Sequence, residues 1–251
     1  MDQSGAIVGP LLTTVLMLYF GFTFRDIFLF SFIPGVIALL VILFFVKETV
    51  PKEGARWEFL SGIKSTLTSR YRQLLTIVAI FSLGAFNFSF ILLNAELMGV
   101  TEALIPLVYA FLNVTHTIIG IPAGMLADRI GKEKVLEIGY FFFMGTCALL
   151  LLPINNIIFA YIIAGIFGLY FGVVETVQRA MVPQYASDGM RGTAYGIYYL
   201  IVGLSFFVSN AIVGWLWNSY GSFLASIYSI STTAMSLILM GFFLRDDSRK
   251  D

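Results

Sequence analysis

The chain has 251 residues, of which 59% are hydrophobic and only 12% are charged, and its formal net charge is zero. A soluble domain carries about 25% charged residues, and a single core at this length cannot bury so much apolar surface. We therefore expect an integral membrane protein, and the zero net charge gives no indication of a nucleic-acid partner.

Long apolar runs follow one another along the whole sequence. A helix needs about 20 residues to cross the hydrocarbon core of a bilayer, and these runs are too long for the strands of a membrane barrel. The sequence therefore predicts an all-α, polytopic membrane protein with eight transmembrane helices. Their expected ranges are 5–24, 27–46, 74–98, 103–125, 135–153, 157–178, 193–217 and 222–244.

The first expected helix contains Gly5, Gly9 and Pro10. Glycines four residues apart let two helix backbones approach closely, and a proline inside a helix removes one hydrogen bond and bends the axis. Taken alone, these residues indicate a helix–helix interface.

Basic residues set the expected orientation of the spans. The sequence has 15 Lys and Arg residues, and with these ranges all of them except Arg25 fall on one side of the membrane. Because cytoplasmic loops carry the excess of positive charge, we expect both termini to be cytoplasmic. The same rule places the stretch GMLADRIGKEK, residues 124–134, on that side.

This charged stretch resembles the loop motif of the major facilitator superfamily, which joins the second and third helices of each six-helix half. The matching residues are Gly124, Leu126, Asp128, Arg129, Gly131, Lys132 and Lys134. The resemblance implies that residues 74–251 form a C-terminal six-helix half and that residues 1–46 are the last two helices of the other half. Residues 47–73 would then be the cytoplasmic central loop.

Gly5, Gly9 and Pro10 also resemble the antiporter motif on the fifth helix of this family, although Thr13 stands where a further glycine is often found. The family has twelve helices, so the resemblance implies that four helices are missing from this chain. The missing helices, or a second copy of the chain, would then be needed for activity.

The resemblance implies a secondary active transporter of the cell membrane that works by alternating access. The antiporter-like motif favours proton-coupled efflux of a small organic compound. Two alternatives stay open, namely uptake of a small solute by uniport or symport, and a truncated fragment that does not transport. The sequence has no nucleophile–base pair, metal-ligand cluster or phosphate loop, so we expect no enzyme, metal or cofactor.

The loop motif and the sixth expected helix supply candidate gate residues. By resemblance, Asp128 faces the N-terminal end of a helix in the opposite half, near Gly5, where an anion is stabilised by the helix dipole. We expect Arg129 to pair with Glu175, with Arg179 beside them, because ionisable residues inside a membrane helix are costly and mostly functional. The alternative is that these charges only fix the topology.

A second group of candidates lies deeper in the expected bundle. His116 is the only histidine, and Asn113 shares its helix face. A histidine can carry a proton in the physiological pH range, although an interhelical hydrogen bond is an equally simple role. By resemblance, the cavity lies between helices that carry Asn87, Asn94, Tyr195, Tyr198 and Tyr199.

Overall fold

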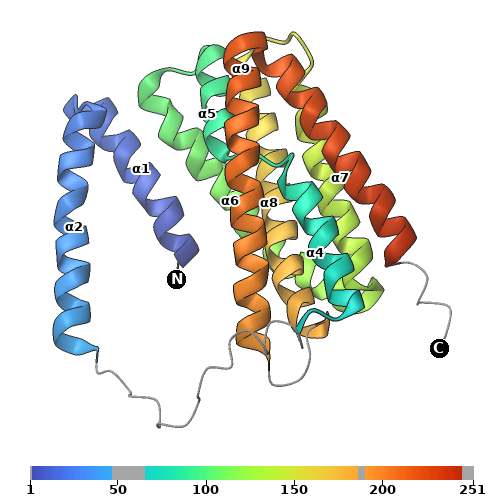
Figure 1. Ribbon diagram of the computed structural model, residues 1–251. Helices are drawn as coiled ribbons and strands as arrows, with labels where there is room; N and C mark the ends of the chain where they lie inside the picture. The colour runs from blue at the N-terminus through green and yellow to red at the C-terminus, as the bar shows by residue number, and fades with distance from the viewer. Residues whose placement is uncertain (1, 47–65, 186–189, 245–251) are drawn as a thin grey trace.

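The computed structural model describes residues 2–46, 66–185 and 190–244, and every regular element in these ranges is helical (Figure 1). The expected all-α fold is therefore confirmed for this part of the chain. In chain order the elements are α1 (Asp2–Phe20), α2 (Phe24–Phe45), α4 (Ser69–Ser82), α5 (Phe88–Leu97), the 3-10 turn η1 (Glu102–Leu104), α6 (Ile105–Ile130), α7 (Lys132–Leu150), α8 (Ile157–Tyr185) and α9 (Arg191–Phe243).

Several of these helices are long and apolar enough to cross a membrane. Among the described residues these helices are α2, α8, α9 and the run Glu102–Ile130, which contains α6. α1 and α5 are apolar but shorter. These helices agree with a multi-pass membrane protein, whereas the number of eight spans stays a prediction.

α9 contains two of the expected spans. Gly221 has φ +79° and ψ −177° inside this segment, a conformation that glycine adopts readily and other residues rarely do. The chain reverses within α9, so two antiparallel helices cross the bundle (Figure 1). The expected joint before residue 222 coincides with this glycine.

The expected span 74–98 is not one helix, and this prediction is wrong. α4 ends at Ser82 and α5 begins only at Phe88. Asn87 caps α5, because its Oδ1 accepts hydrogen bonds from the Ser89 amide at 2.9 Å and the Ser89 hydroxyl at 2.7 Å. An Asn side chain that bonds nearby backbone amides competes with helix continuation, so the apolar run is interrupted at this point.

Two other helices are longer than expected. α6 continues through Asp128 and Arg129 to Ile130, and α8 continues past residue 178 to Tyr185. The joint between α6 and α7 is the single residue Gly131, whose φ of +98° explains the glycine there. The charges of the expected loop motif therefore lie mostly on helix ends, since α6 stays helical up to Ile130 and α7 begins at Lys132.

The division into residues 1–46, 47–73 and 74–251 stays a prediction. Residues 47–65 lie outside the described ranges, and α4 already begins at Ser69, where the Thr68 hydroxyl accepts a hydrogen bond from the Tyr71 amide at 3.2 Å. The joint after α1, the joint after α7 and the reversal within α9 lie at one end of the bundle. The joint between α6 and α7 and the ends of α2 and α8 lie at the other (Figure 1).

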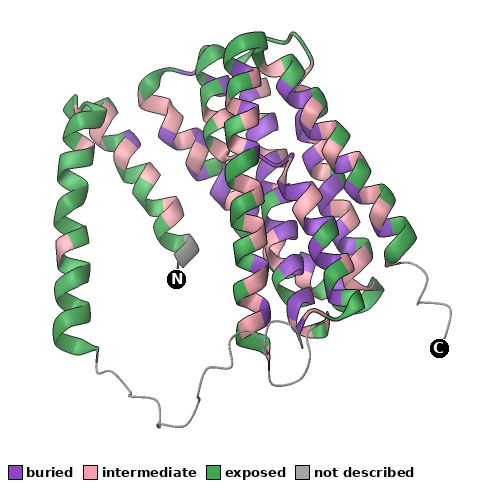
Figure 2. Ribbon diagram, viewed as in Figure 1, coloured by how far each residue is buried: buried purple, intermediate pink, exposed green. Residues whose placement is uncertain are grey.

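Buried side chains concentrate where α4 to α9 pack together (Figure 2). The two largest helix contacts in the described chain are those of α8 with α6 and with α7, and α1 packs on α6. α2 has no buried residue and is green along almost its whole length in Figure 2. The site described next lies on α8, at the centre of the packed group.

Candidate functional site

Three glycines on α8 bring it against α6. A Cβ atom at Gly168 would lie 2.4 Å from the Leu112 carbonyl oxygen, and one at Gly172 would lie 2.4 Å from the His116 carbonyl oxygen. A Cβ at Gly165 would lie 3.1 Å from the ring of Phe111. Small residues permit such close backbone approach in membrane helices, so this stripe fixes α8 in register with His116.

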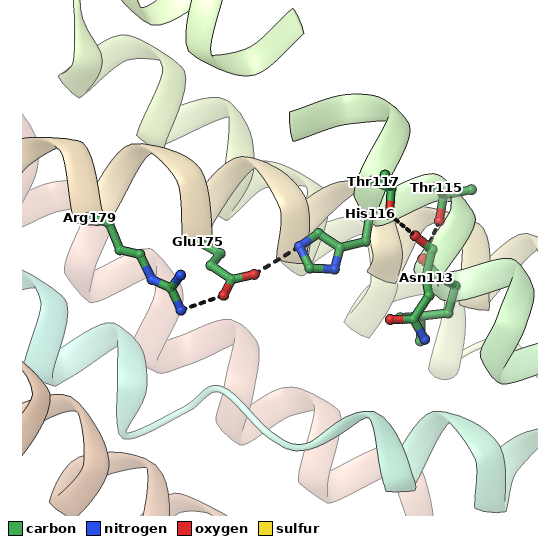
Figure 3. A network of polar contacts seen from close by, with 7 residues as sticks. Asn113, Thr115, His116, Thr117, Glu175 and Arg179 are labelled. Carbon is green, nitrogen blue, oxygen red and sulfur yellow. Dashed lines mark hydrogen bonds and ion pairs between the residues drawn. The ribbon is translucent and has the colours of Figure 1, made fainter. Parts of the chain in front are cut away.

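The close packing places three ionisable side chains in a row (Figure 3). His116 Nε2 on α6 lies 2.8 Å from Glu175 Oε2 on α8, and Arg179 Nη2 lies 2.5 Å from Glu175 Oε1. The exposed fractions of the side chains are 8% for His116, 26% for Glu175 and 53% for Arg179. The carboxylate is thus held between a buried imidazole and a half-exposed guanidinium.

The two imidazole nitrogens of His116 have different surroundings. Nε2 donates to the carboxylate, whereas Nδ1 is buried and has no hydrogen-bond partner in the described structure. Phe171 packs on the ring with a centroid distance of 4.9 Å. The imidazole therefore contacts the carboxylate through one of its two nitrogens.

A cavity of about 270 Å³ opens beside this row. Its walls come from the end of α4, the interruption before α5, the middle of α8 and the first helix of α9. Nine of its 17 lining residues are aromatic, and Glu175 and Arg179 both reach it. The lining residues are Phe81, Ser82, Ala85, Phe86, Asn87, Phe88, Phe167, Tyr170, Phe171, Val174, Glu175, Gln178, Arg179, Tyr198, Tyr199, Val202 and Phe206.

A buried hydrogen-bond chain closes the cavity next to Arg179. Tyr198 donates its hydroxyl proton to Gln178 Oε1 at 2.8 Å, and Gln178 Nε2 donates to the Tyr140 hydroxyl at 3.0 Å. The Tyr140 ring stacks on Phe81 at a centroid distance of 3.8 Å. These polar groups satisfy one another, so they rigidify the wall and leave the ion pair as its charged feature.

The structure brings only some of the expected cavity residues together. Asn87, Tyr198 and Tyr199 line the cavity, whereas Asn94, Asn113 and Tyr195 are not among its lining residues. The Asn94 and Asn113 amides stay within their own helices, bonded to Met98 Sδ at 3.4 Å and to the Tyr109 carbonyl at 2.8 Å.

Tyr195 has a different task from the expected one. Pro183 lies inside α8 and has no N–H, so the Arg179 carbonyl loses its usual helical partner. The Tyr195 hydroxyl donates to this carbonyl at 3.0 Å. Tyr195 therefore supports the segment of α8 that carries Arg179.

Two residues of the loop region form hydrogen bonds with the C-terminal end of α8. Lys132 Nζ donates to the Ala180 carbonyl at 3.0 Å, and the Tyr185 hydroxyl donates to Glu133 Oε1 at 2.7 Å. The expected pairing of Arg129 with Glu175 is not formed, because His116 and Arg179 occupy the two carboxylate oxygens.

Within the described ranges, no such contact involves the remaining motif residues. Asp128, Arg129, Leu126 and Lys134 are exposed in the described structure. A Cβ at Gly124 would meet only Thr176, at 3.8 Å, which is ordinary contact.

The antiporter-like residues of α1 do not form a tight interface with the rest of the described chain. A Cβ at Gly5 or Gly9 would have no described atom within 4 Å. Pro10 lies inside the helix, and the Thr14 hydroxyl donates to its carbonyl at 3.0 Å. The interface interpretation of these glycines thus finds no partner here.

Two features of the site were absent from the sequence-based candidates. Tyr140 completes the buried chain with Gln178, and Ala85 and Phe86 line the cavity at the interruption before α5. The glycine spacing at 165, 168 and 172 was a usable signal for the α6–α8 contact, since it marks one face of a helix. Nothing in the local sequence indicates that the Tyr140 hydroxyl forms a hydrogen bond with Gln178.

The comparison with known families decides the class of protein. The family model described as Major Facilitator Superfamily matches residues 74–251, which is more than half of the chain. The chain belongs to the major facilitator superfamily. The matched region of this superfamily member contains α4 from residue 74 onward and all of α5 to α9, and with them the cavity and the His116–Glu175–Arg179 row.

Curated relatives agree with this assignment. An uncharacterized MFS-type transporter of Methanocaldococcus jannaschii is 32% identical over 247 residues, which cover 90% of this chain and 59% of that protein. Uncharacterized proteins of Mycobacterium bovis and Mycobacterium tuberculosis are 23% identical over 249 residues, covering 96% of the chain and again 59% of their own length. This superfamily member therefore spans about three fifths of the length of these relatives.

Proposed function

We propose that this chain is part of a secondary active transporter that exports a small organic compound in exchange for protons. The observation that carries the proposal is the contact of His116 with Glu175, at 2.8 Å, where Glu175 lines a cavity inside the helix bundle. Ionisable residues within membrane helices are rare and mark ion or substrate pathways. The aromatic lining of the cavity suits the apolar body of an organic compound.

A proton bound by His116 changes the charge of the site. With a neutral imidazole, Glu175 and Arg179 balance each other. Protonation of His116 raises the sum to one positive charge and strengthens its bond to the carboxylate. If the affinity for the substrate depends on this charge, proton binding changes substrate affinity. By linkage, substrate binding then changes proton affinity by the same factor.

The direction of transport rests on the antiporter-like residues of α1. Gly5, Gly9 and Pro10 support exchange of the compound against protons. The charge count favours a second candidate, uptake by symport, because a protonated site attracts an anion. Counterflow of protons and compound distinguishes the first candidate, and flow in the same direction distinguishes the second.

We infer that further helices complete the transporter. The relatives are longer than this chain, and α2 buries no side chain. The cavity wall comes from α4, α5, α8 and α9, all in one group of helices. Alternating access needs a second wall that rocks against the first, supplied by additional helices or a second copy. In this arrangement both termini are cytoplasmic in the cell membrane, and the bilayer surrounds α2.

His116→Gln tests the coupling. The glutamine amide keeps a donor for Glu175 but does not gain or lose a proton between about pH 5 and 8, where histidine ordinarily changes its charge. We expect the variant to lose proton movement in response to a pH jump. Proteoliposomes with trapped pyranine measure internal pH while a panel of small aromatic compounds is added. Compound-driven proton movement that is equal in the parent and in His116→Gln would contradict the proposal.

Asp128→Ala tests the gate hypothesis for the loop motif. A carboxylate opposite a helix N-terminus contributes about 0.3–1 kcal/mol, which corresponds to at most about a fivefold change in transport. We therefore expect a two- to fivefold loss with normal membrane insertion. Glu102→Ala, at another exposed carboxylate, serves as the control. Unchanged transport in Asp128→Ala would leave these charges with a role in topology only.

A further inference from the structure

The interruption between α4 and α5 forms a large part of the cavity wall. Six of the 17 lining residues lie between Phe81 and Phe88. The path of the chain over residues 83–87 therefore decides the shape of this wall. A continuous helix through the same residues would turn different side chains toward the cavity.

An interrupted helix leaves backbone groups without their helical partners. In a membrane protein no lipid group can satisfy them, so irregular backbone is tolerated only where protein or a water-filled cavity surrounds it. Two bonds from distant residues meet this need here. The Tyr228 hydroxyl donates to the Leu83 carbonyl at 2.6 Å, and the backbone N–H of Asn87 donates to Asn210 Oδ1 at 2.9 Å.

The two bonds hold opposite ends of the interruption from two different helices. Asn210 lies on the first helix of α9, before the turn at Gly221, and Tyr228 lies on the second. Asn210 is oriented by its own helix, because its Nδ2 donates to the Phe206 carbonyl at 2.7 Å. Neither Asn210 nor Tyr228 lines the cavity, although Phe206 does.

The second helix of α9 also touches the interruption directly. A Cβ at Gly84 would lie 1.6 Å from Thr232 Oγ1 and 3.4 Å from the Ser229 Cα. Only a glycine allows this approach, which puts the Tyr228 hydroxyl within reach of the Leu83 carbonyl. Contacts with α9 therefore stabilise the interruption, in addition to the local cap at Asn87.

We propose that Asn210 and Tyr228 are positioning residues that set the shape of the substrate cavity by holding the interruption of α4–α5 open. The inference rests on the proposed function only in giving the cavity a substrate. Loss of either bond frees a backbone group inside the membrane. The wall at Ala85 and Phe86 then becomes mobile, and the cavity loses the shape that selects its occupant.

The test reads the wall through an introduced thiol. The only native cysteine, Cys147, is buried, so it contributes little background labelling. Ala85→Cys places a reporter on the interrupted wall, and Asn155→Cys places a remote reporter on an exposed joint. Each reporter is combined with Tyr228→Phe or Asn210→Ala, and a small, charged methanethiosulfonate reagent measures the labelling rate in membranes.

Matched controls separate the bonds from the residue types. Tyr220→Phe and Asn218→Ala remove the same groups from exposed positions on the same segment, near the turn. A hydrogen bond contributes about 0.5–1.5 kcal/mol net, so its loss should accelerate labelling of Ala85→Cys about three- to tenfold. We expect this acceleration in both variants, with no change in the controls or at Asn155→Cys.

Equal labelling of Ala85→Cys in the parent and both variants would overturn the proposal. A parallel rise at Asn155→Cys would also overturn it, because the bonds would then support the whole fold and not the wall. Labelling needs no transport, so the result is independent of the proton-coupling test with His116→Gln. Failure of one proposal can therefore be told apart from failure of the other.

Discussion

Glu175→Gln is expected to reduce proton-coupled transport about 10- to 100-fold, since bonds to a charged group are worth about 1.5–3 kcal/mol. The change removes the charge that Arg179 and a protonated His116 share, while the side chain keeps its size and an oxygen that accepts from Nε2. Compound binding should be less affected than coupling, because the aromatic walls stay in place. Pyranine-loaded proteoliposomes measure the protons moved for each concentration of compound.

Glu96→Gln is the matched control for this variant. Glu96 lies on α5 and is exposed, so its neutralisation should leave coupling within twofold of the parent. If Glu175→Gln couples as well as Glu96→Gln, then the row of ionisable residues has no part in transport and stabilises only the α6–α8 contact.

Gly172→Ala is expected to lower the free energy of unfolding by about 1–3 kcal/mol, the usual cost of overpacking a close contact. The added Cβ would lie 2.4 Å from both the His116 carbonyl oxygen and Ile119 Cγ2. The His116 carbonyl belongs to the backbone and cannot move aside by changing rotamer, so α6 and α8 must separate. The same movement should lengthen the His116–Glu175 contact, so coupling should fall together with stability. Thermal unfolding in detergent measures the first effect.

Gly145→Ala provides the comparison within the same bundle. Gly145 lies inside α7, and a Cβ there would meet no described atom within 4 Å. Alanine is preferred over glycine inside a helix by about 0.5–1 kcal/mol, so this variant should be as stable as the parent or slightly more so. A melting temperature of Gly172→Ala equal to that of Gly145→Ala would argue against close packing at this contact.

The sequence predicted the helical class, the membrane environment and most helix positions, because long apolar runs carry strong local signals. The turn at Gly221 was predicted from its neighbours, and the family from the residues of 124–134. Glu175, Arg179 and His116 were also identified individually, since ionisable residues inside apolar runs are conspicuous.

Contacts between distant segments were beyond the local pattern. The interruption at residues 83–87 lies in an apolar run that reads as one span, and its cause is the approach of α9 at Thr232 and the cap at Asn87. Likewise, Glu175 was expected to pair with Arg129, because both residues were placed near the cytoplasmic ends of their helices. The register fixed by Gly168 and Gly172 instead brings His116 to the carboxylate.

Because His116 is the only histidine of the sequence, every imidazole NMR signal of the chain belongs to it, and its protonation can be followed directly. Protein labelled with ¹⁵N-histidine gives one imidazole in solid-state NMR spectra of membranes. In the described structure Glu175 contacts this imidazole, and Arg179 contacts the other oxygen of Glu175. The account predicts that the signals of Nδ1 and Nε2 change reversibly as the imidazole gains and loses its second proton when the pH is changed, and that Glu175→Gln alters this response. An imidazole whose signals do not respond to pH in either protein would contradict the proton-coupling role.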